Sequence, residues 1–466
     1  MPVTLTPPAA AEEPPLIPRQ VLFGNPEIAA VDLSPDGKRL VFLAPYEGVL
    51  NLWVRDLEGR SPARLLTRAS RRPHDPASWT ADGRYLISSR DGDGDENTVL
   101  VRIDPITGES VDLTPPKGVQ AALVAADRDV PDELVVGLND RDPRYHDLYV
   151  LSLSTGAMRL LYTVADGRPV SVMHVNGDWH PYLRGEPLPD GGSAYELRLP
   201  GETEWRPFQR FDFRDSRVSG PIGFTRDGRW LYGALTTDED LPRIVRWSRD
   251  QLARCGTDCR PELVHRSSAG AVGFAVSDIE TGTPMVLVET DLRSRRVVLD
   301  DTVQPDLDAL QRLAGDASFS ILDRDRSDRL WLVAISSSDR SAEYWLWDRE
   351  RRTSRKLFAI QPKLDQYALV PMESLDLKAR DGRRLPAYLT RTAMPADGPQ
   401  PLVLLVHGGP QARDFWGYDP MHQLLANRGY HALSVNYRGS TGFGKAHLLA
   451  GEGEWYGAMQ DDLVDA

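Results

Sequence analysis

The residues best suited to chemistry gather near the C-terminal end of this sequence, in two glycine-rich segments. His407-Gly-Gly-Pro410 directly follows an apolar run over 402–406, and residues 436–444 read Asn-Tyr-Arg-Gly-Ser-Thr-Gly-Phe-Gly. Taken alone, the first segment fits a ligand-binding loop and a plain strand-ending turn equally well. A nucleophilic serine often stands in Gly-x-Ser-x-Gly, and this pattern is missing from the sequence. The nearest look-alike, Gly439-Ser440-Thr441-Gly442, lacks that spacing.

No metal site and no cofactor are predicted. Cys255 and Cys259 have no histidine or second cysteine pair nearby, so the four ligands of a structural metal are lacking. A local disulfide would suit an oxidising compartment, but the sequence shows no export signal, and we expect two free thiols in a surface loop. Residues 91–96 begin like a calcium loop, yet Glu96 and Arg102 stand where such a loop needs glycine and glutamate. We expect a solvated acidic hairpin there.

Composition argues against several classes of protein. The 466 residues carry a formal net charge of −13 at pH 7, which leaves no basic excess for binding nucleic acid. No apolar run approaches the roughly 18 residues needed to span a bilayer. Residues 1–18 are rich in Pro, Ala and Glu and lack the basic start of a secretory signal, so we expect a flexible tail. These features predict a cytoplasmic protein that binds neither nucleic acid nor membranes.

Residues 19–365 contain an internal repeat. Leu33-Ser-Pro-Asp-Gly37 is answered by Trp79-Thr-Ala-Asp-Gly83 and Phe224-Thr-Arg-Asp-Gly228, each leading into alternating apolar residues that predict a β-strand. Four weaker copies bring the repeat to seven, marked by Asp36, Asp82, Asp129, Asp178, Asp227, Glu280 and Asp328. Successive marker residues are 46, 47, 49, 49, 53 and 48 positions apart. Such spacing is typical of propeller blades, and we predict about seven. A pair of β-sandwiches with coincidental turns is the alternative. One helix is expected over 305–315.

The pattern changes after residue 365. Residues 374–379 and 385–390 alternate on either side of Asp381-Gly382 and predict a hairpin. Four more elements are expected: a strand buried on both faces over 402–406, a helix over 419–427, a strand over 430–435 and a helix over 455–466. Strands that alternate with helices predict a parallel sheet, so we assign 366–466 to a partial α/β domain.

These segments resemble the prolyl oligopeptidase family, most closely its acylaminoacyl-peptidase and dipeptidyl-aminopeptidase-like branch. The residues that carry the resemblance are His407-Gly-Gly-Pro410, Arg428-Gly-Tyr430, 436–444, 455–463, the join at 377–390 and the lead Val21-Leu-Phe-Gly-Asn-Pro26. The resemblance implies a seven-bladed β-propeller followed by the N-terminal part of an α/β-hydrolase domain. It further implies a serine peptidase with a Ser-Asp-His triad, acting on small peptides that the propeller admits.

The resemblance also assigns roles to single residues. In related enzymes a backbone N–H of the His-Gly-Gly-Pro turn stabilises the oxyanion of the tetrahedral intermediate. Here that donor would be the N–H of Gly409, supported by His407, Gly408 and Pro410. Glycine suits this role because a side chain would block the approach of substrate. His407 is expected to shape the turn, and Arg438 to form a structural ion pair, with a substrate contact as the alternative.

The sequence departs from the family at the triad. The family's serine, aspartate and histidine all follow the fourth strand of the hydrolase sheet, so the triad is expected beyond Ala466. We therefore predict that the 466-residue chain alone hydrolyses neither peptides nor esters. In the family's sheet the third strand lies between the fourth and fifth, so 402–406 should form an open apolar edge. The competing hypothesis is a protein-binding propeller with a vestigial hydrolase segment. Peptide specificity and oligomeric state are left open.

Overall fold

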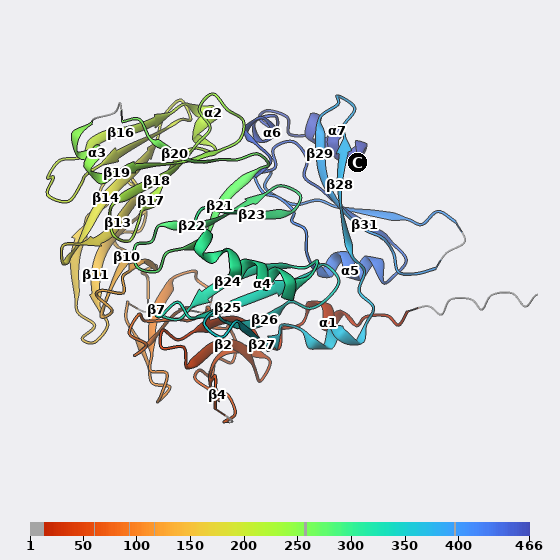
Figure 1. Cartoon of the computed structure of the whole chain (residues 1–466), viewed down its shortest axis with the longest axis horizontal. Helices are drawn as coiled ribbons and strands as arrows, with labels where there is room; N and C mark the ends of the chain where they lie inside the picture. Colours follow the sequence, from red (N-terminus) through yellow and green to blue (C-terminus); the bar gives the residue numbers. More distant parts are fainter. Residues whose placement is uncertain (1–13, 60, 93, 116, 256–258, 396–397) are drawn as a thin grey trace, which may run out of the picture.

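Most of the structure consists of antiparallel sheets that follow one another along the chain. The computed structural model describes residues 14–59, 61–92, 94–115, 117–255, 259–395 and 398–466. Within these residues, seven sheets are each built from consecutive strands. The innermost strand of the first sheet, β1 (Ala29–Leu33), lies beside β5 (Ser78–Trp79) of the second and beside β24 (Ser318–Arg324) of the last. This closure is consistent with the predicted seven-bladed propeller (Figure 1).

The first four sheets hold β1 to β16. Besides β1 and β5, their strands are β2 (Arg39–Tyr46), β3 (Val49–Asp56), β4 (Arg64–Leu65), β6 (Leu86–Asp91), β7 (Thr98–Ile103), β8 (Ser110–Asp112), β9 (Ala121–Ala126), β10 (Glu133–Asp142), β11 (Tyr145–Ser152), β12 (Met158–Tyr162), β13 (Val170–Val175), β14 (Asp178–Pro187), β15 (Ser193–Leu197) and β16 (Arg206–Phe211). The β6–β7 pair is the acidic hairpin that we expected, and residue 93 within it lies outside the described residues.

The last three sheets of the ring hold β17 to β27. Besides β24, their strands are β17 (Gly220–Phe224), β18 (Trp230–Leu235), β19 (Arg243–Ser248), β20 (Glu262–Arg266), β21 (Ala271–Ser277), β22 (Pro284–Thr290), β23 (Ser294–Val298), β25 (Leu330–Ser336), β26 (Glu343–Asp348) and β27 (Thr353–Ala359). The sixth sheet has three strands, and the predicted helix α4 (Gln304–Ala314) follows it. Leu307 and Leu310 of α4 are buried in the core of the sixth and seventh sheets.

Helices are short and lie mainly at the ends of sheets. They are α1 (Arg19–Phe23), α2 (Phe213–Ser216), α3 (Arg249–Arg254), α5 (Pro420–Ala426), α6 (Lys445–Leu449), α7 (Ala458–Asp465) and the 3₁₀ turns η1 (Asp301–Val303) and η2 (Pro362–Gln366). The predicted helices over 419–427 and 455–466 correspond to α5 and α7. In the ranges that the structure describes, every helix falls short of the length and apolar character that crossing a bilayer requires.

The repeated Asp-Gly turns share one conformation. Ser34, Thr80 and Thr225 each donate a side-chain hydrogen bond to the aspartate two positions on, at 2.6, 2.7 and 2.6 Å. The glycine that follows has a φ of 65° to 70°, and its N–H donates to the carbonyl of the same Ser or Thr. In the seventh sheet Asp328, with φ 56°, takes the glycine position and donates to the Asp325 carbonyl. The predicted alignment of Asp328 with Asp36 is therefore wrong by one residue.

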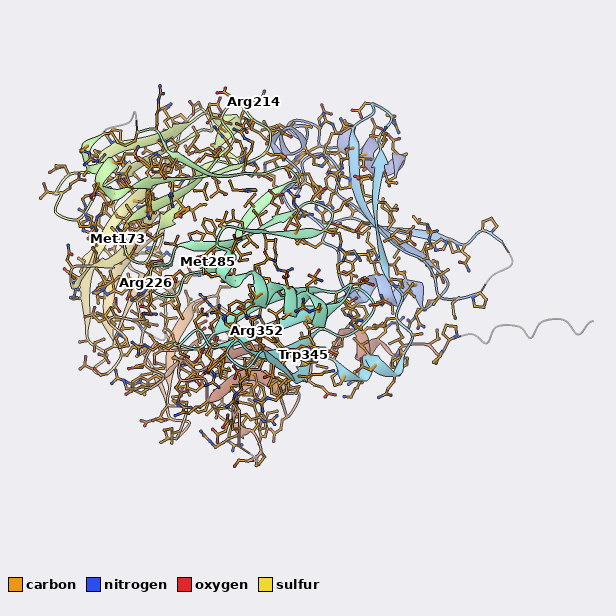
Figure 2. All side chains as sticks on the ribbon, viewed as in Figure 1. Met173, Arg214, Arg226, Met285, Trp345 and Arg352 are labelled. Carbon is orange, nitrogen blue, oxygen red and sulfur yellow. A yellow bond between two sulfur atoms is a disulfide. The ribbon has the colours of Figure 1, made fainter. Side chains whose placement is uncertain are left out.

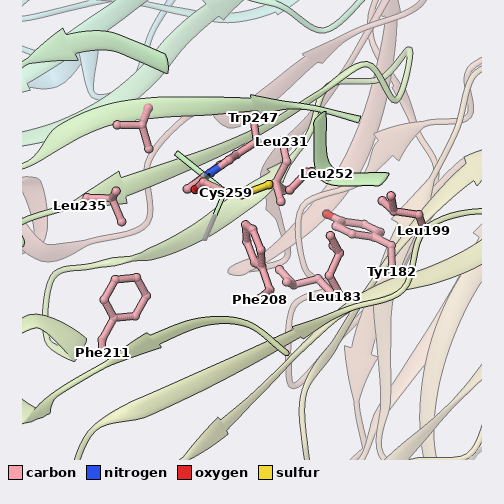
Figure 3. Close-up of a cluster of buried hydrophobic side chains, with 12 residues drawn as sticks. Tyr182, Leu183, Leu199, Phe208, Phe211, Leu231, Leu235, Trp247, Leu252 and Cys259 are labelled. Atoms are coloured by element: carbon pink, nitrogen blue, oxygen red, sulfur yellow. Dashed lines mark hydrogen bonds between the residues drawn. The ribbon is translucent and has the colours of Figure 1, made fainter. Parts of the chain in front are cut away.

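Apolar side chains pack between neighbouring sheets. Figure 3 shows the cluster between the fourth and fifth sheets, where the Phe208 and Trp247 rings meet edge-on with centroids 5.2 Å apart. Trp247 is fully buried, and its Nε1–H donates to the Cys259 carbonyl at 3.0 Å. Met285 and Trp345, labelled in Figure 2, pack against the corresponding cluster of the sixth and seventh sheets. Large side chains thus hold adjacent blades together.

The two cysteines form a disulfide, so our expectation of free surface thiols is wrong. Cys259 is 5% exposed within the Figure 3 cluster, and Cys255 packs against the same cluster. The reason is the helix α3, whose Leu252 is buried in that core and draws the end of the helix inward. The sequence around the two cysteines predicted a surface loop. In the structure, Leu252 before it and Cys259 at its end are both buried in the core.

The C-terminal segment forms a separate sheet of order β28-β29-β31-β30. β28 (Met372–Lys378) and β29 (Arg384–Thr390) form the predicted hairpin, and β29 pairs antiparallel with β31 (His431–Val435). β31 and β30 (Leu402–Leu405) pair in parallel, so the sheet is mixed rather than parallel. Leu402 at the edge is 50% exposed, which contradicts burial on both faces and confirms the open apolar edge.

The residues just before α1 are packed against the C-terminal segment. The Ile17 N–H donates to Asn427 Oδ1 at 2.6 Å, and Ile17 is fully buried with Leu22 and Leu364. The flexible tail was expected over 1–18, and its residues 1–13 lie outside the described residues. Its last residues are therefore anchored, because Ile17 supplies an apolar side chain to a cluster formed by both ends of the propeller.

Two carboxyl groups join the first, second and last sheets. Asp323 Oδ2 of β24 accepts a hydrogen bond from the Leu33 N–H at 2.9 Å, and Asp32 Oδ2 of β1 accepts one from the Trp79 N–H at 3.0 Å. Burial and the neighbouring Asp323 carboxyl raise the pKa of Asp32 to about 8, and burial raises the pKa of Asp323. The two carboxyls therefore share a proton across the seam of the ring at neutral pH.

Substituting Gly83 by alanine should destabilise the propeller by about 1–2 kcal/mol, because alanine must adopt a left-handed backbone. The new Cβ would lie 3.7 Å from its nearest neighbour, so the loss is conformational rather than steric. Gly273→Ala is the matched control, since Gly273 lies in β21 without positive φ and with nothing within 4 Å of an added Cβ. That control should gain about 0.5–1 kcal/mol. Urea unfolding followed by tryptophan fluorescence gives both values, and equal effects would refute this assignment of the turn.

The Asp32–Asp323 pair should contribute less to the free energy of unfolding of the propeller as pH rises. A carboxyl whose pKa is raised on folding stabilises the folded state fully below its unfolded pKa near 3.8, and this contribution is lost as pH rises through about 8. Asp32→Asn removes the titration but keeps a side-chain oxygen for the Trp79 N–H. Urea unfolding should show this variant gaining stability over the parent between pH 5 and pH 9. A difference that stays constant across this range would contradict the shared proton.

Candidate active site

The turn after β30 presents a backbone donor at Gly409. Gly409 has a φ of 131°, and a Cβ at this position would lie 2.7 Å from the Gln411 nitrogen, so the conformation requires glycine. Among the described residues, neither the Gly408 N–H nor the Gly409 N–H has a protein acceptor. A pair of unpaired N–H groups on a glycine turn is the arrangement that binds an oxyanion.

His407, which was expected to shape this turn, contacts Tyr437 and Ser440. Its ring stacks on Tyr437 with centroids 4.6 Å apart, and the Tyr437 hydroxyl donates to the His407 carbonyl at 3.0 Å. His407 Nε2 lies 2.9 Å from Ser440 Oγ. Ser440 is fully buried, which excludes it as an accessible nucleophile despite its glycine-flanked setting. The nearby His447 is buried as well, and burial lowers the pKa of its imidazole to about 4.

Gly409 faces a cavity of about 480 Å³ between the C-terminal segment and the propeller. Its lining residues are Arg217, Gly409, Pro410, Gln411, Gly439, Leu448, Gly451, Glu452, Trp455 and Met459. Arg217 comes from the connection between β16 and β17, and its Nη2 lies 3.6 Å from Glu452 Oε1 across the cavity. Both side chains are about one-third exposed, so this ion pair is weak and can open for a ligand.

A second hollow of about 260 Å³ lies beside Val406, the residue that follows β30. Its walls are mainly apolar and are formed by Val406, Gly409, Pro410, Tyr437, Trp455, Tyr456, Met459, Gln460 and Leu463. Trp455 is 67% exposed and Tyr456 97% exposed, which is unusual for large aromatic residues of a monomeric surface. Gly409 and Pro410 line both hollows, so the turn separates the propeller-facing space from the open sheet edge.

Arg438 binds two carboxylates and does not line the cavity. Its Nη2 and Nε lie 2.6 and 2.8 Å from the two oxygens of the fully buried Asp462, and Nη2 reaches Asp381 at 3.0 Å. The Asp462 and Asp381 carboxylates raise the pKa of the Arg438 guanidinium above its ordinary value. This geometry favours the structural ion pair over the substrate contact.

Sequence reasoning did not find three residues of the site. Arg217 and Glu452 lie 235 positions apart and meet only through the packing of the propeller on the C-terminal segment. Asp414 beside the turn has a buried Oδ2 without a partner among the described residues, and burial raises the pKa of its carboxyl. No local pattern marks these residues. In the part of the chain that the structure covers, no group of three or more His, Cys, Asp or Glu could hold a metal ion.

Comparisons with known proteins relate the chain to peptidases. No family model matches. Dipeptidyl aminopeptidase BIII of Pseudoxanthomonas mexicana is 38% identical over 458 residues, covering 97% of this chain and 65% of the relative. Dipeptidyl peptidase family member 6 of Caenorhabditis elegans is 28% identical, covering 97% and 64%. The chain thus spans less than two-thirds of the length of these curated relatives.

Solved structures show the same fold. A prolyl endopeptidase superimposes with a TM-score of 0.69 at 14% identity, covering 97% of this chain and 68% of the other. A puromycin-hydrolysing peptidase of Mycobacterium tuberculosis gives a TM-score of 0.65 at 18% identity, covering 98% and 73%. The chain is therefore related in sequence to dipeptidyl aminopeptidases and shares its fold with prolyl endopeptidase.

Removing Arg438 should destabilise the C-terminal segment strongly. Arg438→Ala leaves the Asp462 carboxylate buried without its guanidinium partner, for which we expect a loss of about 3–5 kcal/mol. Arg380→Ala is the control, because Arg380 pairs with Asp461 and Asp465 at a side-chain exposure of 55% and should cost less than about 1 kcal/mol. Limited proteolysis should cleave the first variant faster within 366–466 while the propeller stays protected. Equal cleavage of both variants would contradict a structural role.

Proposed function

We propose that this chain supplies the propeller and the oxyanion-binding part of a serine peptidase of the prolyl oligopeptidase family that releases dipeptides from short peptides. The observation that carries this proposal is the unpaired N–H of Gly409, a residue that lines a cavity shared with the propeller. In acyl transfer, such a donor stabilises negative charge on the carbonyl oxygen as the tetrahedral intermediate forms. The 38% identity to a dipeptidyl aminopeptidase supports the substrate class.

The position of the cavity supports a gating role for the propeller. Arg217 belongs to the propeller and Glu452 to the C-terminal segment, and both line the cavity that Gly409 faces. A peptide that enters between these two parts of the molecule can bring its carbonyl to Gly409. Extended or folded polypeptides would meet the ring of blades first, which favours small substrates.

The chain alone lacks a group that can attack the carbonyl. Gly-x-Ser-x-Gly is missing from the sequence, and Ser440, the nearest look-alike, is fully buried and bonded to His407. An oxyanion donor without a nucleophile does not hydrolyse peptides at a useful rate. We therefore assign the 466-residue chain an inactive state on its own, with the nucleophile supplied by residues that it does not contain.

A fusion experiment tests the proposal. The 466-residue chain is compared with a fusion to the part of the Pseudoxanthomonas mexicana enzyme that it does not match. A fluorophosphonate probe should label a serine in the fusion and none in the chain alone, because only the fusion holds a nucleophile. The fusion should also release dipeptides from chromogenic dipeptide amides, measured by absorbance.

Gly409→Ala in the fusion is the variant that addresses the oxyanion donor. Its Cβ displaces the turn, and loss of one such donor lowers kcat by about 10²–10³-fold. Gly273→Ala in β21, at a residue that lines neither hollow beside the turn, should leave kcat unchanged. Labelling of the chain alone, or full activity of the Gly409→Ala fusion, would overturn the proposal.

A further inference from the structure

A cavity of about 540 Å³ opens where the first and second blades meet. Its lining residues are Leu66, Thr67, Arg68, Ala69, Ser70, Arg71, Arg72, His74, Arg90, Asp91, Gly92 and Ser110. Four arginines and a histidine face one aspartate in this lining. Such a concentration of cationic side chains is unexpected in a chain whose formal net charge is −13. We call this cavity the arginine pocket.

Three of the guanidinium groups have identified partners. Arg68 donates to the Tyr46 hydroxyl at 3.0 Å and lies over the Tyr46 ring at 5.3 Å, so its contacts are with a neutral group. Arg72 pairs with Asp91 at 3.1 Å, and Arg90 pairs with Asp112 at 2.7 Å. A guanidinium has five N–H donors, and a single carboxylate contact leaves others for a ligand.

His74 gives an independent indication of a ligand. Its Nδ1 is shielded from solvent and has no hydrogen-bond partner within the described ranges. Burial and the nearby Arg90 charge lower the pKa of His74, so the ring is neutral at neutral pH. A buried ring nitrogen without a partner is costly, and an oxygen-bearing ligand in the arginine pocket would satisfy it.

The arginine pocket lies at the end of the propeller that faces the C-terminal segment. It is formed by the connection from β4 to β5 and by the start of the β6–β7 hairpin. The equivalent connection from β20 to β21 reaches the C-terminal segment through the Ala271 N–H, which donates to the Gly442 carbonyl at 3.1 Å. The equivalent β22–β23 hairpin reaches it through Asp291, which pairs with Arg384 at 2.8 Å. Arg217, which lines the Gly409 cavity, also lies in an equivalent connection, that from β16 to β17.

We propose that the arginine pocket binds the carboxylate groups of an acidic peptide, which it holds on the propeller surface facing Gly409. Carboxylate oxygens match the spacing of guanidinium N–H groups, and these charge-assisted bonds are stronger than neutral ones. That the bound peptide is a substrate rests on the proposed function. The binding itself depends only on the first two blades, which belong to the described propeller.

The test measures binding to the 466-residue chain, without any catalytic readout. The probe is an N-acetylated, C-amidated peptide of four glutamates carrying a fluorophore, followed by fluorescence polarisation. The same peptide with four glutamines is the uncharged control. Arg68→Ala should weaken binding of the glutamate peptide by about 10-fold or more, since it removes charged hydrogen bonds. Arg351→Ala is the matched control, because Arg351 is 70% exposed in the β26–β27 hairpin, outside the arginine pocket, and should not change binding.

Three results would overturn the inference. The glutamine peptide could bind as tightly as the glutamate peptide, the Arg68 and Arg351 variants could bind alike, or inorganic phosphate could compete at concentrations below those of the free peptide. The last result would indicate a phosphate site instead. Arg90→Gln provides a second variant if Arg68→Ala lowers the thermal stability, and it should weaken binding to a similar extent. Because no turnover is measured, failure here leaves the proposed peptidase function untouched.

Discussion

The position of Gly409 opposite the propeller depends on ion pairs between two parts of the chain. Arg384 forms two bonds of 2.8 Å with the carboxylate of Asp291, and Lys445 lies 2.6 Å from Asp215. Lys445 and Asp215 are both largely buried, so their attraction is screened little by solvent. These contacts hold the C-terminal segment against the fifth and sixth blades. Together with hydrogen bonds such as that from the Tyr388 hydroxyl to the Leu292 carbonyl, they keep Arg217 of the propeller beside Glu452 in the lining of the Gly409 cavity.

The C-terminal sheet has an exposed apolar edge. β30 lies at its edge beside Val406, which is 49% exposed, and the adjacent hollow is walled by Trp455 and Tyr456. Exposed apolar edges of this kind favour pairing with another strand. The Gly409 turn lies between this edge and the propeller-facing cavity. A group placed against the edge of β30 would therefore be close to Gly409, which agrees with the proposed division between nucleophile and oxyanion site.

Local patterns could be predicted from the sequence, and long-range packing could not. The Asp-Gly turns, the hairpin around Gly382 and the helix α4 follow from residues close together in the chain. The prediction failed where distant contacts decide the outcome. Cys259 is drawn into a core by Leu252 and Trp247, and the Asp32–Asp323 pair joins residues 291 positions apart.

In the candidate site, too, local motifs could be predicted and long-range contacts could not. Gly409 and its neighbours could be named because they form one contiguous motif with a recognisable turn. Arg217, Glu452 and the arginine pocket have no such motif, since each arises where separate connections meet at one end of the propeller. The register error at Asp328 has a related cause, because an aspartate in left-handed conformation takes the place that Gly37, Gly83 and Gly228 occupy in the Asp-Gly turns.

The cluster of Ile17, Leu22 and Leu364 has a consequence for the integrity of the ring. Every blade is made of consecutive strands, so among the described residues no strand is shared between the first and last blades. Ile17 lies just before the first blade and Leu364 just after the last, and both pack with Tyr418 and Leu424 of the C-terminal segment. The C-terminal segment therefore links the beginning of the ring to its end, and the same segment carries the Gly409 turn.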